Sequence, residues 1–304
     1  MSTFPIRRVD RNRAKAVETL GSKPKFWFQE GEKRLLFKAE DRGTGEDWAE
    51  VASCHLCELL GLPHVAYELA AEYDDRSYCR PGVVCENMAP PPVSLVLGNQ
   101  LLLALDPDYP ASQRFKVRQH TVDAVVEIVD VLLAPPGATW MDSAAEDIKT
   151  ALDVFAGYVM LDAWIANQDR HHENWGALSD GSKIWLAPTF DHGAALARNL
   201  TDKERSERMT TRDRNRTIVA FAKGGRSAFY GSAVDARPLG TIEAFQAFGN
   251  VVPQARNAWL NRLGAVNREA LCGILERVPP ERMSETCRQF TLELLLTNQQ
   301  RLLE

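Results

Sequence analysis

Several features that define specialised classes of protein are missing from this sequence of 304 residues. No apolar run is long enough for a membrane-spanning helix or a signal peptide, so membrane insertion is not expected. The net charge of −5 argues against bulk binding to DNA. Repeats and low-complexity tracts are also missing. The sequence therefore predicts a cytoplasmic globular protein, and delivery into a host cell stays open as the alternative.

Cysteine is scarce and irregularly spaced. Six cysteines occur, and only Cys54 and Cys57 form a C-x-x-C pair, for which no second pair supplies a matching half-site. Both lie in a segment rich in apolar residues, where small buried thiols are more common than a metal or redox site. We therefore expect reduced thiols, as in a cytosolic protein.

The first third of the sequence predicts strands and one helix. Thr44 is a candidate N-cap for that helix, and Gly61 followed by Leu62-Pro63 is a typical helix end. The segment 29–33 is a candidate hairpin turn. The expected strands are 25–28, 34–38, 65–70 and 82–86.

The rest of the sequence predicts mainly helices. The expected helices are 120–133, 144–166 and 284–303, and two short strands are expected at 175–178 and 183–186. The proline-rich run 89–92 is the best candidate boundary. We predict an α+β fold of two lobes, a small β-rich lobe at 1–90 and a larger α-helical lobe at 91–304, with an ATP-binding cleft between them.

A polar octet, 167–174, lies between the long expected helix and the strand pair. It contains Asp169 and Asn174, five residues apart. In such a loop an Asp can orient or accept a hydroxyl proton, and an Asn oxygen can bind a hard metal ion. Asp191, beyond the strand pair, can share that ion. Phosphoryl transfer requires charge neutralisation and alignment of phosphates, so the pattern predicts a phosphotransferase that uses ATP and Mg²⁺.

Upstream residues can supply the phosphate-binding side of such a site. Lys38 ends an apolar strand, and Glu50 in the following helix is its candidate partner, with Glu46 and Asp47 as alternatives. The turn that precedes the first hairpin can cover phosphates with backbone N–H groups and positive charge, although alone it resembles an ordinary β-turn. Its candidate residues are Gly21, Ser22, Lys23 and Lys25.

The segment at the predicted boundary can bind a nucleotide base. Backbone groups of Glu86 and Met88 are candidates for hydrogen bonds to the adenine edge. Val84 and Met88 are candidates for its apolar walls. An ordinary strand end between two lobes would have the same sequence, so this prediction depends on the rest of the pattern.

A zinc or iron site is a second interpretation of the octet. Adjacent histidines do not readily face one ion, and the H-x-x-x-H spacing of a helical site does not occur, so we prefer the phosphotransferase. The candidate ligands are Asp169, His171, His172, Glu173, Asp191 and His192.

At these residues the sequence resembles the HipA-like kinase family of bacterial proteins, which share the protein-kinase and lipid-kinase architecture. The resemblance is most specific at 167–171, with Asn174 and Phe190-Asp191. It implies that Asp169 is the catalytic base, that Asn174 and Asp191 bind Mg²⁺, and that Lys38 binds phosphate. His171 matches the family's loop histidine, with the implied role of shaping the loop. The short chain looks closer to compact, CtkA-like serine/threonine kinases than to full-length HipA toxins.

The segment 198–226 is basic and carries interleaved hydroxyl groups. We expect it to dock an acidic partner or to be autophosphorylated, with a solvated loop as the alternative. The leading hypothesis is a serine/threonine kinase that acts on a protein substrate. The alternatives are a small-molecule or phosphatidylinositol-type lipid kinase and a non-catalytic pseudokinase. The combination of Lys38, Asp169, Asn174 and Asp191 argues against the last of these.

Overall fold

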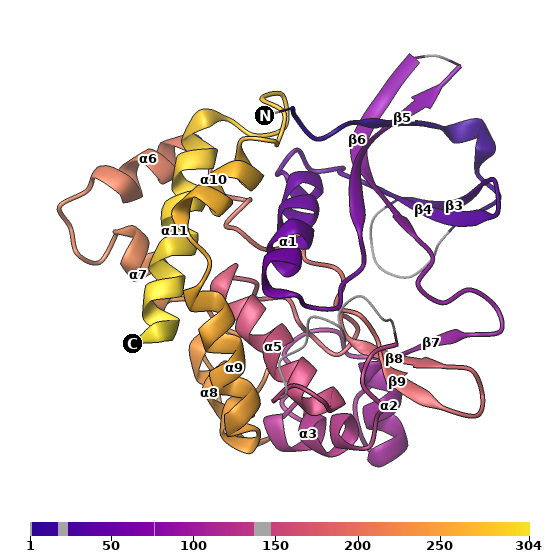
Figure 1. The fold of residues 1–304 in the computed structure, drawn as a ribbon, viewed down its shortest axis with the longest axis vertical. Helices are drawn as coiled ribbons and strands as arrows, with labels where there is room; N and C mark the ends of the chain where they lie inside the picture. Colours follow the sequence, from indigo (N-terminus) through magenta and orange to yellow (C-terminus); the bar gives the residue numbers. More distant parts are fainter. Residues whose placement is uncertain (1, 18–23, 76, 137–146) are drawn as a thin grey trace.

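The computed structural model describes residues 2–17, 24–75, 77–136 and 147–304 (Figure 1). Its strands are β1 Arg7–Asp10, β2 Ala16–Val17, β3 Lys25–Glu30, β4 Lys33–Ala39, β5 Tyr67–Asp74, β6 Ser77–Glu86, β7 Ser94–Leu97, β8 Gly176–Ser179 and β9 Ile184–Leu186. Its helices are the short 3₁₀ helix η1 Arg11–Arg13, α1 Glu46–Leu60, α2 Gly98–Leu105, α3 Val122–Asp130, α5 Ala151–Trp164, α6 Asp202–Thr210, α7 Ile218–Lys223, α8 Thr241–Val251, α9 Pro253–Gly264, α10 Arg268–Leu275 and α11 Glu285–Leu303.

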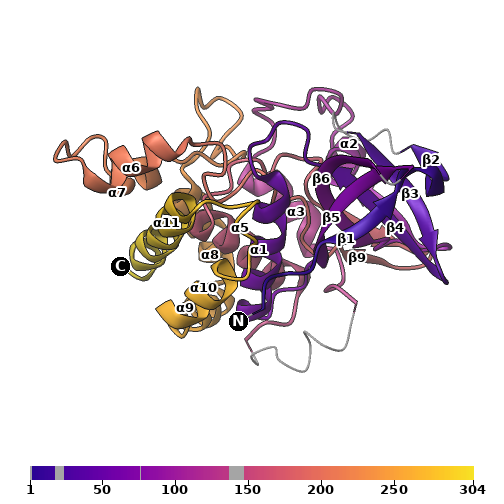
Figure 2. The same ribbon diagram turned by 90° about the horizontal axis from the view of Figure 1, so that it is seen from above.

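The N-terminal part is a curled sheet of six strands in the order β1-β5-β6-β4-β3-β2 (Figures 1 and 2). Because side chains alternate along a strand, its two faces differ in chemistry. One face buries a small apolar cluster that includes Phe28, Phe37 and Val84. The opposite face carries Lys25 and Lys38, which are directly paired across β3 and β4. This face forms one wall of the cleft described below.

Helix α1 packs against the sheet, and its N-terminus differs from the expected one. The N-cap is Gly45 at φ 85°, not Thr44. A Cβ at Gly45 would lie 1.9 Å from Nε1 of Trp48, so both the backbone conformation and the space require glycine there. The carboxylate of Glu40 accepts hydrogen bonds from the backbone N–H groups of Thr44 and Glu46 and thereby satisfies this end of the helix.

Most of the helices lie in the C-terminal part, around the buried helix α5. This helix begins later than the sequence pattern predicts, because Thr150 and Asp153 form a capping box that starts it at Ala151. The last helix agrees with the prediction, with Ser284 as its N-cap. A small sheet of β7, β8 and β9 faces the first sheet, and β7 was not predicted.

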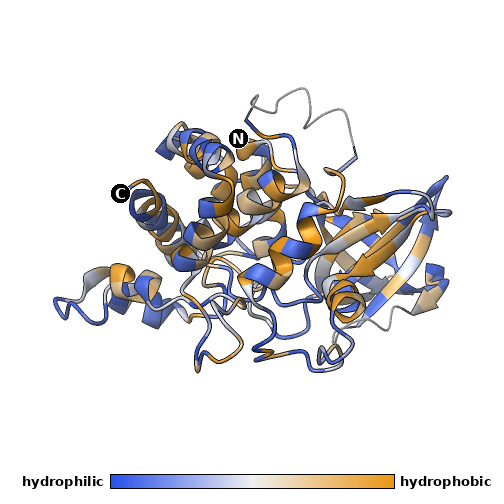
Figure 3. Ribbon diagram, turned by 90° about the horizontal axis from the view of Figure 1, so that it is seen from below, coloured by the Kyte–Doolittle hydropathy of each residue, from blue (hydrophilic) through white to orange (hydrophobic). Residues whose placement is uncertain are grey.

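Helices α6 and α7, within the basic segment 198–226, pack on α11 at the side of the helical part away from the first sheet (Figures 1 and 2). In Figure 3 the helices carry both hydrophilic and hydrophobic residues, as expected when one face is buried. Within the described ranges, each helix is either too short or too polar to cross a lipid bilayer.

Candidate active site

A cleft of about 500 Å³ separates the first sheet from the helical part. It is lined by the connection 86–89 together with residues from both sides. Its residues from the sheet side include Lys25, Trp27, Leu36, Lys38, Tyr67 and Cys85. Its residues from the other side include Leu95, Leu97, Arg114, Glu173, Asn174, Phe190 and Asp191. The cleft thus has apolar walls near the connection and charged groups at one end, as a nucleotide site requires.

Lys38 is the central charged group of the cleft. Its Nζ lies 2.6 Å from Oε1 of Glu50 and 2.8 Å from Oδ1 of Asp191. Burial opposes the positive charge, but the carboxylates of Asp191 and Glu50 outweigh it and raise the pKa of Lys38 well above its usual value. Burial raises the pKa of Glu50, and the nearby Asp191 charge adds to this. The ammonium group of Lys38 is therefore what allows two acidic side chains to lie so close together.

The alternatives to Glu50 have other partners. Glu46 lies 2.5 Å from Arg198, and Asp47 lies 3.0 Å from Arg282. Both pairs connect α1 to segments of the helical part. The first turn of α1 therefore joins the two sides of the molecule, whereas Glu50 contacts Lys38, which lines the cleft.

Asp191 is held in an unusual backbone conformation. Its φ of 62° lies in the left-handed region, which Asp tolerates better than most residues. The next backbone N–H, that of His192, donates to Oε2 of Glu50 at 2.7 Å. A Cβ at Gly193 would lie 3.3 Å from the carbonyl oxygen of Glu46, so the absence of a side chain lets this segment approach α1 closely. These contacts orient the Asp191 carboxylate toward Lys38.

Asp169 and Asn174 are joined through the backbone of their loop. Nδ2 of Asn174 donates to the carbonyl oxygen of Asp169 at 2.6 Å. Because Nδ2 is bound to the loop, Oδ1 is the amide atom that can face the cleft, which Asn174 lines. The side chain of Asp169 is 37% exposed, so its carboxylate is accessible to an acceptor molecule. The amide oxygen of Asn174 and the carboxylate of Asp191, a second residue that lines the cleft, form a hard donor set that suits Mg²⁺.

A buried ion pair between Arg170 and Asp162 supports this loop. Arg170 binds both carboxylate oxygens of Asp162 on α5, through Nε and through NH2 at 2.8 Å. Asp162 also accepts from Nδ2 of Asn167 at 2.8 Å, and Arg170 donates to the carbonyl oxygen of Asn174 at 3.2 Å. Asp162 was not among the predicted site residues. The available signal was a carboxylate after the apolar run 154–161 of α5, because buried charges are almost always paired.

His171 is placed to shape the loop rather than to carry charge. Its Nδ1 accepts from the backbone N–H of Glu173 at 3.2 Å, and its Nε2 lies 3.8 Å from Oδ1 of Asp169. Burial lowers the pKa of His171 to about 4, and the positive charge of Arg114 contributes. Burial also lowers the pKa of His172 to about 4. Both imidazoles are therefore neutral near pH 7.

We predict that neither His171 nor His172 titrates between pH 7.5 and about 5.5, because their pKa values are both about 4. The unfolded chain binds these protons at about pH 6.5. The stability contributed by the two neutral imidazoles is therefore full above pH 6.5 and decreases as the pH falls toward 4. NMR titration of the Cε1–H signals checks this, with His171→Gln to assign one of them. An inflection of the His171 signal near pH 6.5 would contradict the prediction.

The octet does not form a zinc or iron site. Nδ1 of His172 is hydrogen-bonded to Tyr109 at 2.7 Å, and Nε2 of His192 is hydrogen-bonded to Thr189 at 2.8 Å. Among the described residues, the one convergent group of three potential metal ligands lies elsewhere. The histidines of the octet therefore support the loop and do not gather around one point.

Some of the remaining predicted site residues line the cleft and others do not. Lys25, Glu86 and Met88 line the cleft as expected. Val84 does not, because strand alternation turns its side chain into the apolar cluster of the sheet and directs Cys85 to the cleft instead. Arg114 lines the cleft but was not predicted, and its local sequence contains no signal for it. Gly21, Ser22 and Lys23 lie outside the described residues.

The cleft, the Lys38–Glu50 pair and the loop with Asp169 and Asn174 together define a kinase-like fold. No protein-family model and no curated protein sequence matches this chain. Among solved structures, the Helicobacter pylori proinflammatory kinase CtkA is similar, with a TM-score of 0.69 and 17% identity over 97% of this chain and 99% of that one. The toxin–antitoxin protein HipA of Shewanella oneidensis MR-1 has a TM-score of 0.50 at 12% identity, over 95% of this chain and 65% of that one. The chain therefore has the fold of HipA- and CtkA-like kinases, which confirms the predicted fold.

Proposed function

We propose that this protein is an ATP- and Mg²⁺-dependent kinase that transfers the γ-phosphate to a serine or threonine hydroxyl of a protein. The observation that carries the proposal is the convergence of Lys38, Glu50 and Asp191 at one end of the cleft, beside Asn174. These residues come from four separate parts of the chain. A scaffold without catalytic function would have no reason to keep a buried lysine between two carboxylates.

The cleft indicates how a nucleotide would bind. The side chain of Glu86 is paired with Lys33 at 2.8 Å, so its backbone is the group expected to contact the base. Lys25 and Lys38, which are neighbours across two strands, are positioned to bind phosphate oxygens. Asp191 and the amide oxygen of Asn174 would hold Mg²⁺, which neutralises phosphate charge when bound. Asp169 would orient the acceptor hydroxyl and accept its proton.

Asp169 lines a second cavity of about 520 Å³ and is not among the residues that line the first. Arg114 lines both cavities, and Lys116 adds a second cation to this one. Its remaining lining mixes polar residues with apolar ones, the latter being Phe115, Val117, Ala228, Ala236 and Pro238. Arg114 and Lys116 suit an acceptor that carries negative charge near its hydroxyl group, such as a peptide segment with acidic residues. The headgroup of an inositol phospholipid is also anionic, so transfer to peptide and lipid panels decides between the two. We further propose that the basic segment 198–226 docks an acidic partner. Its last residue, Arg226, donates its backbone N–H to Gln168, which lines this cavity.

We predict that Mg-ATP raises the thermal unfolding temperature, because a ligand that binds only the folded state stabilises it. Thermal shift with ATP, with and without Mg²⁺, measures binding. Transfer of labelled γ-phosphate to panels of proteins, peptides, lipids and sugars then measures activity and identifies the acceptor class. A shift that is accompanied by no transfer to any panel would favour the pseudokinase alternative. The absence of any shift would overturn nucleotide binding itself.

A further inference from the structure

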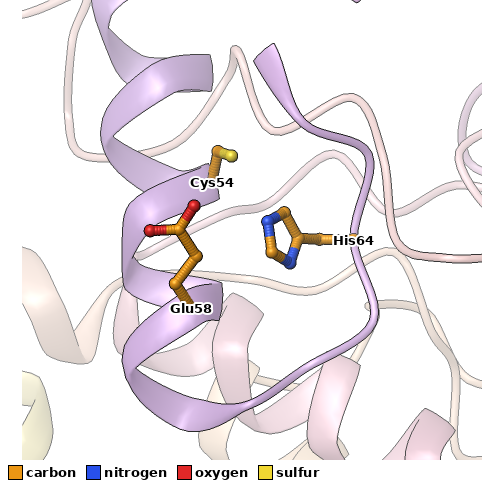
Figure 4. Close-up of side chains that lie close together, drawn as sticks. All are labelled: Cys54, Glu58 and His64. Carbon is orange, nitrogen blue, oxygen red and sulfur yellow. The ribbon is translucent and has the colours of Figure 1, made fainter. Parts of the chain in front are cut away.

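Three potential metal ligands converge where α1 meets the segment that leads to β5. Cys54 and Glu58 are one helical turn apart on α1, and His64 lies beyond the end of the helix. One ligand atom from each residue (a thiol sulfur, a carboxylate oxygen and an imidazole nitrogen) lies within 4.8 Å of the other two. Figure 4 shows the three side chains pointing toward one another across the gap between the helix and this segment.

Each of these three side chains is also oriented by a second contact. Nδ1–H of His64 donates to the carbonyl oxygen of Leu62 at 2.7 Å, which leaves Nε2 as the nitrogen with a lone pair. Oε2 of Glu58 is hydrogen-bonded to Nδ1 of His55 at 2.7 Å. The backbone of Tyr67 forms a hydrogen bond to the thiol of Cys54. Outer contacts of this kind fix ligand orientation in protein metal sites.

We propose that Cys54, Glu58 and His64 bind a divalent transition-metal ion of the zinc class, with water as the fourth ligand. Sulfur, imidazole nitrogen and one carboxylate suit Zn²⁺, whereas Mg²⁺ prefers oxygen ligands alone. The side chain of Glu58 is 53% exposed, which provides a path for the ion and space for the water. Cys54 is buried at 3% exposure on the opposite side of the cluster.

Ion binding replaces the thiol proton of Cys54, which is released to solvent. Burial raises the pKa of this thiol to about 12, so without an ion it is protonated at neutral pH. Affinity for the ion therefore increases with pH. His64 and Glu58 offer lone pairs on an imidazole nitrogen and a carboxylate oxygen.

The proposed metal site is linked to the charged residues of the cleft through α1 and through the segment that contains His64. Glu50 lies one turn before Cys54 on α1. The segment with His64 is held to Thr189 by two backbone hydrogen bonds of 3.0 Å, through Pro63 and Val65. Thr189 lies two residues before Asp191. An ion at this site would therefore tie together the two elements that carry the carboxylate partners of Lys38.

Titration of the full chain with Co²⁺, without nucleotide and with excess Mg²⁺, tests the site independently of kinase activity. We expect one tetrahedral Co²⁺ per chain, with visible d–d bands and a near-ultraviolet thiolate-to-cobalt band, and displacement by Zn²⁺. Cys54→Ser should lose the thiolate band. His64→Ala should weaken Co²⁺ binding at least about tenfold. Cys79→Ser, which removes an exposed thiol on β6, should bind as the wild type does.

Circular dichroism of each variant confirms that it is folded. If Cys54→Ser does not fold, His64→Ala and Glu58→Gln carry the test, because both side chains are at least partly exposed. The proposal is overturned if the wild type shows no thiolate-to-cobalt band. It is also overturned if the band persists unchanged in the folded variants of the three ligands.

Discussion

Replacing Asp169 by Asn is expected to reduce phosphoryl transfer by about 10²–10⁴-fold, the usual contribution of a general base. The substitution keeps the size of the side chain and removes its ability to accept a proton. The backbone carbonyl that Asn174 binds is unchanged, so the loop keeps its shape. Binding of Mg-ATP, measured by thermal shift, should therefore remain close to that of the wild type.

Asp191→Asn tests the proposed Mg²⁺ ligand separately from the proposed catalytic base. Asp191 contacts Lys38 at 2.8 Å and is a proposed Mg²⁺ ligand, so its loss should abolish transfer and also weaken the Mg-ATP shift. Asp130→Asn, an exposed change at the end of α3, serves as the matched control and should alter neither quantity. Equal loss of the Mg-ATP shift in Asp169→Asn and Asp191→Asn would contradict the separate roles proposed for the two residues.

The parts of the site that are close in sequence could be predicted from the sequence. The octet, the strand pair after it and Asp191 form one continuous stretch, so their relation follows from local structure. The contact between Lys38 and Asp191 spans 153 residues, and no local pattern predicts it. It was not predicted, because the resemblance to a known kinase family implied only that Lys38 binds phosphate and that Asp191 binds Mg²⁺. The fold comparison supports that resemblance, although identity to the similar structures is 17% or lower.

Errors of detail arose where the sequence pattern was ambiguous. The strand around Val84 is a continuous apolar run, so alternation did not reveal which side chains face the cleft. Thr44 has the chemistry of an N-cap, but a carboxylate from outside the helix fulfils this role. Arg114 reaches both cavities through tertiary structure alone. The orientation of Val84 and the position of Arg114 depend on contacts between distant segments, which a single sequence does not reveal. The contacts of Glu40 with Thr44 and Glu46 are local, at four and six residues.

Removing Asp162 is expected to cause the largest loss of stability among single substitutions near the site. Asp162→Ala would leave the guanidinium of Arg170 buried without its carboxylate, at 2% exposure. Breaking one side of a buried ion pair typically costs about 3–5 kcal/mol, which should lower the thermal unfolding temperature by several degrees. Asp153→Ala, which removes a partly exposed capping side chain of the same helix, should cost only about 1 kcal/mol.

The double variant Asp162→Leu/Arg170→Met separates stability from positioning. Replacing a buried ion pair by apolar residues of similar size is often neutral, so the double variant should recover much of the stability that Asp162→Ala loses. It cannot restore the hydrogen bonds from Asn167 to Asp162 or from Arg170 to the carbonyl oxygen of Asn174. Transfer activity should therefore stay low while unfolding, followed by circular dichroism, approaches that of the wild type. Recovery of both quantities together would mean that the pair supports the fold but does not position the loop that carries Asp169.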